Sequence, residues 1–277
     1  MTVVRLTLRE AANRKVLLVG AVISAAFLVL FWLGFTVGFD QAEADPIDAS
    51  ETAAAATIMT VLGLYAVQFL AAFMAVLLAS SSVAPEIDSG RLHAMLARPL
   101  SRTSWLFQRA GTFAGLAAVY VVVMSLAVLA IAGGVAGYGA IAPERAVVLL
   151  ALEVVVLVAL GTALSVRLSA IAAGVVVIAL YGAAWIAGIM ELAGNVLDNE
   201  SLERIGVAVS LVIPSDALWR GASYYLQSPA FVAVTRVEDG IPFAGNAAPS
   251  APLVAWAVAY ATGWALLANR WFRRRDL

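Results

Sequence analysis

Long apolar runs dominate this chain and restrict it to very few architectures. Six stretches approach or exceed the roughly 20 apolar residues that a helix needs to cross a bilayer, and 63% of all residues are hydrophobic whereas 13% are charged. Within a bilayer, helices satisfy all their backbone hydrogen-bonding groups internally. The predicted spans are residues 16–39, 53–84, 105–132, 145–166, 170–190 and 252–271. We therefore predict an all-α, polytopic membrane protein with six transmembrane helices, forming a single domain over residues 1–277.

The basic residues indicate which side of the membrane each connection occupies. Six spans put both termini on one side, and Lys and Arg concentrate on the cytoplasmic side of membrane proteins. The side with the termini carries Arg5, Arg9, Arg14, Lys15, Arg91, Arg98, Arg102, Arg109, Arg167, Arg270, Arg273, Arg274 and Arg275. The other side carries Arg145, Arg204, Arg220 and Arg236. Both termini are therefore predicted to be cytoplasmic. Because arginine supplies every basic residue except Lys15, we expect a prokaryotic plasma membrane protein.

The polar segments fit this orientation. Residues 2–15 place Val4, Leu8 and Ala11 on one side, which suits either an amino-terminal interfacial helix at the headgroups or a solvated start. Residues 191–250 form a mixed region on the predicted outside. Its apolar piece, residues 205–213, is too short to span, so we predict external or re-entrant helices there.

A short helix is predicted over residues 85–98, between the second and third spans. Pro85 suits a first helical position, and Glu86 opposes the positive end of the helix dipole. Arg98 complements the negative end, and Pro99 prevents continuation. One face carries Leu92, Met95 and Leu96, and another carries Glu86, Gly90, His93 and Ala97. The first face can rest on protein or lipid, which leaves the second free to meet a partner.

Several enzyme classes lack their required residues. The chain has no cysteine and a single histidine, His93, so it has neither a thiolate metal site nor the paired histidines of an intramembrane metalloprotease. A serine hydrolase triad would need a histidine outside this loop. The only lysine, Lys15, follows Arg14 without a glycine-rich lead, so it does not form a phosphate loop. We expect no catalytic site, no metal site and no cofactor in this chain.

Polar residues inside the predicted spans need a separate explanation, because placing a polar side chain in lipid costs free energy. Glu153 is the only acidic residue deep in a span, and Gln68 invites a weaker form of the same argument. Each either lines a substrate or proton path or forms a polar contact between helices. Arg109 lies close enough to the start of the third span for its side chain to reach the interface.

Small and aromatic residues in the spans have simple structural interpretations. Gly111 and Gly115 form a pattern that lets helices approach closely, within one subunit or across a dimer. Trp32, Trp105 and Trp271 lie near predicted span ends, as expected of an aromatic belt.

The polar loop also carries a family resemblance. Glu86 and Gly90 in the pattern E-x-x-x-G, followed by RPLSR at residues 98–102 between the second and third of six spans, resemble the permease subunits of ABC-2-type transporters, particularly the NosY-like branch. The segment TLREAANRKVLL from Thr7 and the ending FRRRDL are similar to that branch too.

The resemblance implies a permease subunit of an ATP-driven ABC transporter, an exporter, that has no catalytic activity itself. Its implied partners are a cytoplasmic ABC ATPase subunit, which binds ATP and Mg, and a second permease copy in a homodimer or a related permease. Membrane lipid surrounds it, and nucleic acid is not a partner. In that family the loop helix is a cytoplasmic coupling helix seated in a groove of the ATPase. Carried onto this chain, the implied coupling residues are Glu86, Gly90, Arg91, His93 and Arg98.

Two other functions remain open from the residues. A secondary transporter or channel acting alone is expected to have more polar residues at mid-membrane and two duplicated halves. Of these features, only mid-membrane polar residues are found, namely Glu153 and Gln68. A mechanotransmitting permease would pass ATP-driven motion to an external partner through residues 191–250.

Overall fold

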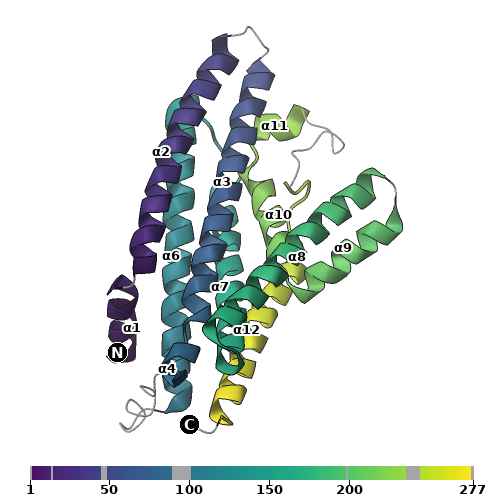
Figure 1. The fold of residues 1–277 in the computed structure, drawn as a ribbon. Coiled ribbons are helices and arrows are strands. Elements are labelled where there is room, and N and C mark those ends of the chain that lie inside the picture. Colours follow the sequence, from purple (N-terminus) through teal and green to yellow (C-terminus); the bar gives the residue numbers. More distant parts are fainter. Residues whose placement is uncertain are drawn as a thin grey trace.

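Six long apolar helices form the body of the molecule (Figure 1). The computed structural model describes residues 2–13, 15–44, 49–88, 101–197, 199–234 and 244–275. The six helices are α2 (Lys15–Ala44), α3 (Ala49–Ser80), α6 (Arg102–Ala136), α7 (Pro143–Arg167), α8 (Ala170–Val196) and α12 (Ala251–Arg273). The shorter ones are α1 (Thr2–Asn13), α4 (Ala84–Asp88), α9 (Glu200–Val212), α10 (Ser215–Leu226) and α11 (Pro229–Val234). The described part of the chain contains no strand, so the prediction of an all-α protein with six helices able to span a membrane is confirmed.

Local sequence signals set several helix boundaries. The side chains of Ser101, Ser169 and Ser250 each accept a hydrogen bond from a backbone N–H in the first turn of α6, α8 and α12. These serines satisfy donors that a helix leaves unpaired at its start. Pro143 occupies the first turn of α7, and Gly137 ends α6 at a φ of 60°, where glycine meets no steric penalty.

The helix α7 lies at the centre of the bundle. It contacts α3, α6, α8, α10 and α12, and its side chains Leu150, Leu157 and Leu160 are fully buried. The outer helix α2 instead exposes large apolar side chains such as Leu18 and Leu30, as expected for a surface facing lipid. Gly161 of α7 permits a close approach to α3, because a Cβ at this position would lie only 2.7 Å from the Cβ of Ala79.

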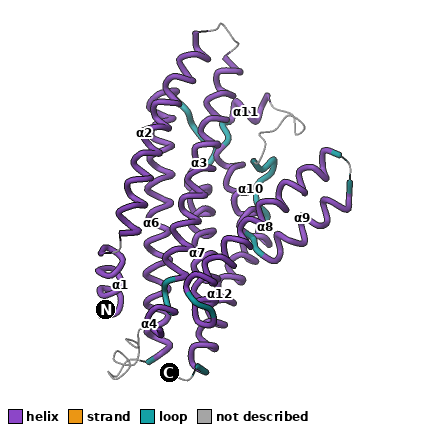
Figure 2. The backbone as a smooth tube through the Cα atoms, viewed as in Figure 1, coloured by secondary structure: helices purple, strands orange, loops and turns teal. Residues whose placement is uncertain are grey.

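Both termini, α1 and α4 lie at one end of the bundle, which we call the α4 end (Figures 1 and 2). The last turn of α2 and the first turn of α3 lie at the opposite end. Only Leu168 and Ser169 separate α7 from α8, one residue fewer than between the spans predicted from the sequence. A shared side for the two termini agrees with six crossings, and the cytoplasmic assignment of that side stays a prediction.

The structure refines the predicted boundaries. Helices α2 and α3 extend beyond the predicted spans into the region around residues 40–51, and α8 continues to Val196 rather than ending near residue 190. Of the helix predicted over residues 85–98, the described part is α4, and residues 89–100 lie outside the described residues.

The region 191–250 contributes helices to the bundle itself. Helix α9 packs along α8, and the chain bends by 102° between α9 and α10. Helix α10 packs against α7, α8 and α3, with Leu218, Trp219 and Ala222 buried. Residues 191–250 are therefore not only a peripheral layer, because α10 forms part of the core.

Candidate functional site

A buried arginine joins three helices at the α4 end. Arg109 of α6 is 1% exposed, and its Nη1 lies 2.9 Å from Oε2 of Glu10 in α1. Its Nη2 lies 3.1 Å from Oε1 of Glu86 in α4. The Nε of Arg109 donates a hydrogen bond of 2.5 Å to the backbone oxygen of Ser82, in the turn before α4. One guanidinium thus holds α1, α4 and the end of α3 against α6.

Spacing along α6 explains why this charge is tolerated inside the protein. Trp105, Arg109 and Phe113 are four residues apart and share one face of the helix. Both rings lie 5.5 Å from the guanidinium carbon and flank the cation with aromatic surface. Trp105 also stacks on Phe272 of α12 with ring centroids 5.5 Å apart and is 1% exposed, so it belongs to the core rather than to the predicted aromatic belt.

The same end of the bundle is connected to the central helix. The Oγ atoms of Ser82 and Ser165, on α7, lie 3.0 Å apart, and both side chains are fully buried. Ser165 also donates to the backbone oxygen of Thr162. The turn that leads into α4 is therefore fixed to both α6 and α7.

The structure places Glu86 differently from its predicted position at a partner surface. The side chain is 2% exposed and faces Arg109, because a charge removed from water is stable only when it is paired. Arg109 was predicted to extend to the membrane interface, but it is held inside by the two carboxylates. The other coupling residues predicted from the resemblance, Gly90, Arg91, His93 and Arg98, lie outside the described residues.

Gln68 and Glu153 meet in the core of the bundle. Nε2 of Gln68, on α3, donates a hydrogen bond of 2.8 Å to Oε1 of Glu153, on α7. Both residues are buried, since Gln68 is 5% exposed and Glu153 is 1% exposed. Of the two interpretations made from the sequence, the described contact corresponds to a polar link between helices.

Aromatic rings next to this link join α3 to α8 and α10. Tyr65 lies 5.0 Å from both Phe69 and Trp219, measured between ring centroids. Tyr181 contacts the edge of Phe69 at 5.7 Å, and the indole N–H of Trp185 donates to the hydroxyl of Tyr65. Sequence reasoning missed this cluster because its members come from three helices distant in the chain.

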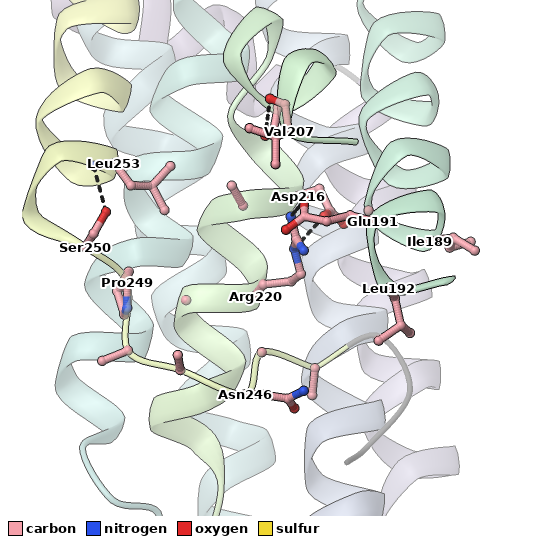
Figure 3. Close-up of a pocket in the computed structure, with 18 of the residues that line it drawn as sticks. Ile189, Glu191, Leu192, Val207, Asp216, Arg220, Asn246, Pro249, Ser250 and Leu253 are labelled. Carbon is pink, nitrogen blue, oxygen red and sulfur yellow. Dashed lines mark hydrogen bonds and ion pairs between the residues drawn. The ribbon is translucent and has the colours of Figure 1, made fainter. Parts of the chain in front are cut away.

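A cavity of about 530 Å³ lies between α8, α9, α10 and the segment before α12. Three charged side chains gather on its wall, as Figure 3 shows: Glu191 of α8 with Asp216 and Arg220 of α10. Nη2 of Arg220 lies 2.5 Å from Oε2 of Glu191, and its Nε lies 3.0 Å from Oδ2 of Asp216. Gly188 lies beside them, and a Cβ at this position would collide with the Asp216 carboxylate unless that side chain moved.

The described residues around the cavity are not grouped like the ligands of a metal centre. Across the part of the chain that the structure describes, no three His, Cys, Asp or Glu side chains are grouped to hold a metal ion. Gln68 and Glu153 do not line the cavity, although Trp185 both lines it and contacts the aromatic cluster.

Comparison of the chain with protein-family models found no matching family, and comparison with curated proteins found no match. The roles proposed below therefore rest on the resemblance carried by residues 86–102 and on the geometry of the described residues.

Proposed function

We propose that this chain is the transmembrane permease subunit of an ATP-driven exporter of the ABC-2 type. The observation that carries the proposal is the pair of ion pairs made by Arg109. They connect α1, α4 and α6 at the end of the bundle that holds both termini. The polar segment 89–100 begins directly after α4 and ends directly before α6. A partner bound to this segment would be connected at both ends to the same buried arginine.

This arrangement suits the transmission of force. Displacement of segment 89–100 would move α4 and, through Glu86 and Arg109, the start of α6. The contact between Ser82 and Ser165 would carry the same displacement to α7, the central helix. A partner shifts a conformational equilibrium only through different affinities for its states. The ATPase must therefore bind the segment differently with and without ATP.

The roles of the coupling residues divide accordingly. We assign Gly90, Arg91, His93 and Arg98 to the contact with a separate nucleotide-binding subunit, which holds ATP and Mg. Glu86 connects that contact to the membrane helices from inside the protein, because its carboxylate is paired with Arg109. The permease itself is non-catalytic, since its only lysine lacks the sequence of a phosphate loop.

A second permease copy fits an open face of α6. A Cβ at Gly111 or Gly115 would meet no atom within 4 Å, and both residues are exposed. These glycines therefore do not serve packing within the described part of the subunit. Small residues allow helices in lipid to approach closely, which supports a homodimer contact along this face.

The proposal is tested by isolating the chain with its partner. A tagged chain purified from membranes of its source cells should carry a Mg-dependent ATPase with it. Replacing residues 90–97 with a Gly/Ser linker of equal length should remove the ATPase, while the permease still inserts and elutes as a folded species. The same replacement at residues 236–243 serves as the matched control and should leave the complex intact. Retention of the ATPase by the 90–97 variant would contradict the coupling assignment.

The buried pair of Gln68 and Glu153 favours one other function, a secondary transporter acting alone. Proteoliposomes containing only this chain separate the two. An ion gradient that drives accumulation of a substrate without ATPase would support the stand-alone transporter. A requirement for the ATPase and ATP would support the proposed permease.

A further inference from the structure

The cavity between α8, α9, α10 and the segment before α12 has an excess of negative charge. Its wall presents two carboxylates, Glu191 and Asp216, against one guanidinium, that of Arg220. When all three are ionised, the described side chains that line the cavity carry one more negative charge than positive charge. Charges of the same sign in a partly enclosed site raise the local concentration of ligands with the opposite charge. The cavity therefore favours a cation.

Asp216 leaves a specific position for a hydrogen-bond donor. The residue is 9% exposed, and its Oδ2 lies 3.0 Å from Nε of Arg220. Neither atom makes a hydrogen bond in the described structure, because the two groups are close but poorly aligned. Nη2 of Arg220 is instead directed to Glu191 at 2.5 Å. Asp216 Oδ2 is paired electrostatically with Arg220 but accepts no aligned hydrogen bond, which a buried carboxylate oxygen favours, and a ligand ammonium would supply one.

Most of the remaining wall is apolar, and its other polar side chains are Ser210, Asn246 and Ser250. Trp185 and Ile189 of α8 are among the lining residues, and Val207 of α9 and Leu253 of α12 contribute aliphatic surface. Figure 3 shows Val207 above the charged group and Leu253 to its left. At about 530 Å³ the cavity is large enough for a small organic molecule, which buries most of its surface in such sites.

We propose that this cavity binds an amphipathic organic cation, with its ammonium group at Asp216 and Glu191 and its apolar body against the apolar part of the wall. A divalent metal is disfavoured because the described residues offer no group of three metal-ligating side chains. An anion is disfavoured because Arg220 already faces two carboxylates. The proposal names a substrate class for the proposed transport function and rests on it for its physiological role.

Binding can be measured without the ATPase, so failure of one proposal does not imply failure of the other. The full chain is reconstituted in nanodiscs of phosphatidylcholine, and three probes of similar shape are compared by equilibrium dialysis: 4-phenylbutylammonium, neutral 4-phenylbutanol and anionic 5-phenylpentanoate. Empty nanodiscs correct for partition into lipid. The ammonium probe should show saturable binding to the protein, at least about tenfold tighter than the alcohol, as expected for a charged hydrogen bond of about 1.5 kcal/mol or more.

Two kinds of variant locate the bound probe. Asp216→Asn removes the charge at similar size and should weaken binding of the ammonium by about tenfold or more. Ala248→Phe leaves the three charges in place but adds a ring at an exposed position that lines the cavity, so it should also reduce binding by occupying volume. Glu200→Gln is the matched control, because Glu200 is exposed and pairs only with the nearby Arg204 among the described contacts.

Equal binding of the ammonium and the alcohol would overturn the proposal, as would tighter binding of the carboxylate. Unchanged binding in both Asp216→Asn and Ala248→Phe would place the probe elsewhere and would also overturn it. If an ammonium-bearing lipid is the natural occupant, phosphatidylethanolamine added to the nanodiscs should compete with the probe. If a free amine is the occupant, only soluble alkylammonium compounds should compete, and either result supports a cation site.

Discussion

At the residue scale, Arg109 is the position where the structure differs most from simple expectation. An arginine near a span end usually extends its side chain to the interface, but this one is 1% exposed between Glu10 and Glu86. From the sequence, Glu86 was predicted to contact a partner subunit, and its pairing with Arg109 was not predicted. The pairing was not predictable because Glu10 and Arg109 are 99 residues apart, and nothing local in the sequence specifies the contact.

We expect Arg109→Leu to destabilise the folded chain by about 3–5 kcal/mol, because it leaves two buried or partly buried carboxylates without their cation. Thermal unfolding of the detergent-solubilised protein, followed by fluorescence-detected gel filtration, measures the loss. Arg204→Leu is the matched control, since the Arg204–Glu200 pair is 79% and 78% exposed. Exposed pairs of this kind contribute at most about 1 kcal/mol. Equal losses of stability in the two variants would show that the buried ion pairs of Arg109 stabilise the protein no more than the exposed pair does.

The polar link between Gln68 and Glu153 makes a second residue-scale prediction. Gln68→Leu should lower the free energy of unfolding by about 1–3 kcal/mol, because it leaves a buried carboxyl without its donor. The double variant Gln68→Leu with Glu153→Leu should recover most of that loss, because no polar group is then left unpaired. A double-mutant cycle measures the coupling. Additive losses would mean that the two side chains do not act as a pair.

At the element scale, the helices and several of their ends followed from local signals. Serines at 101, 169 and 250 begin helices, and a two-residue turn joins α7 to α8. Helix α10 was not predicted as a core element. Its sequence alternates apolar residues with Asp216, Arg220 and serines, and only contacts with α3, α7 and α8 make one face of it buried. Those contacts join helices that are distant in the chain, so no local sequence pattern predicts that α10 is buried.

Glycine packing distinguishes two helices that look alike in sequence. Gly161→Leu should lower the free energy of unfolding by about 1–3 kcal/mol, because the new side chain meets Ala79 of α3 at less than a normal contact distance. Gly115→Leu should leave the unfolding temperature of the monomer nearly unchanged, because a Cβ there meets nothing within 4 Å. Gel filtration and thermal unfolding of both variants check this. A larger loss in Gly115→Leu would show that the face of α6 is closed within one subunit.

At the scale of the whole molecule, the number of spans and the shared end of both termini could be predicted because lipid imposes length and composition on each crossing. The internal order of the spans could not. Helix α7 is central and α2 is peripheral, yet both are long and apolar, and the difference lies in small residues such as Gly161 that let α7 approach its neighbours. The cavity likewise depends on three charged residues that the chain brings together from α8 and α10.

Coupling to a soluble ATPase requires that segment 89–100 face the cytoplasm, where the ATPase can reach it. The chain has no cysteine, so a single introduced thiol can be labelled without background. His93→Cys should react with a membrane-impermeant maleimide only after cells are permeabilised, whereas Glu200→Cys, at an exposed position on the predicted outside, should react in intact cells. Labelling of His93→Cys in intact cells, with Glu200→Cys protected, would contradict the orientation and the proposed coupling to a cytoplasmic ATPase.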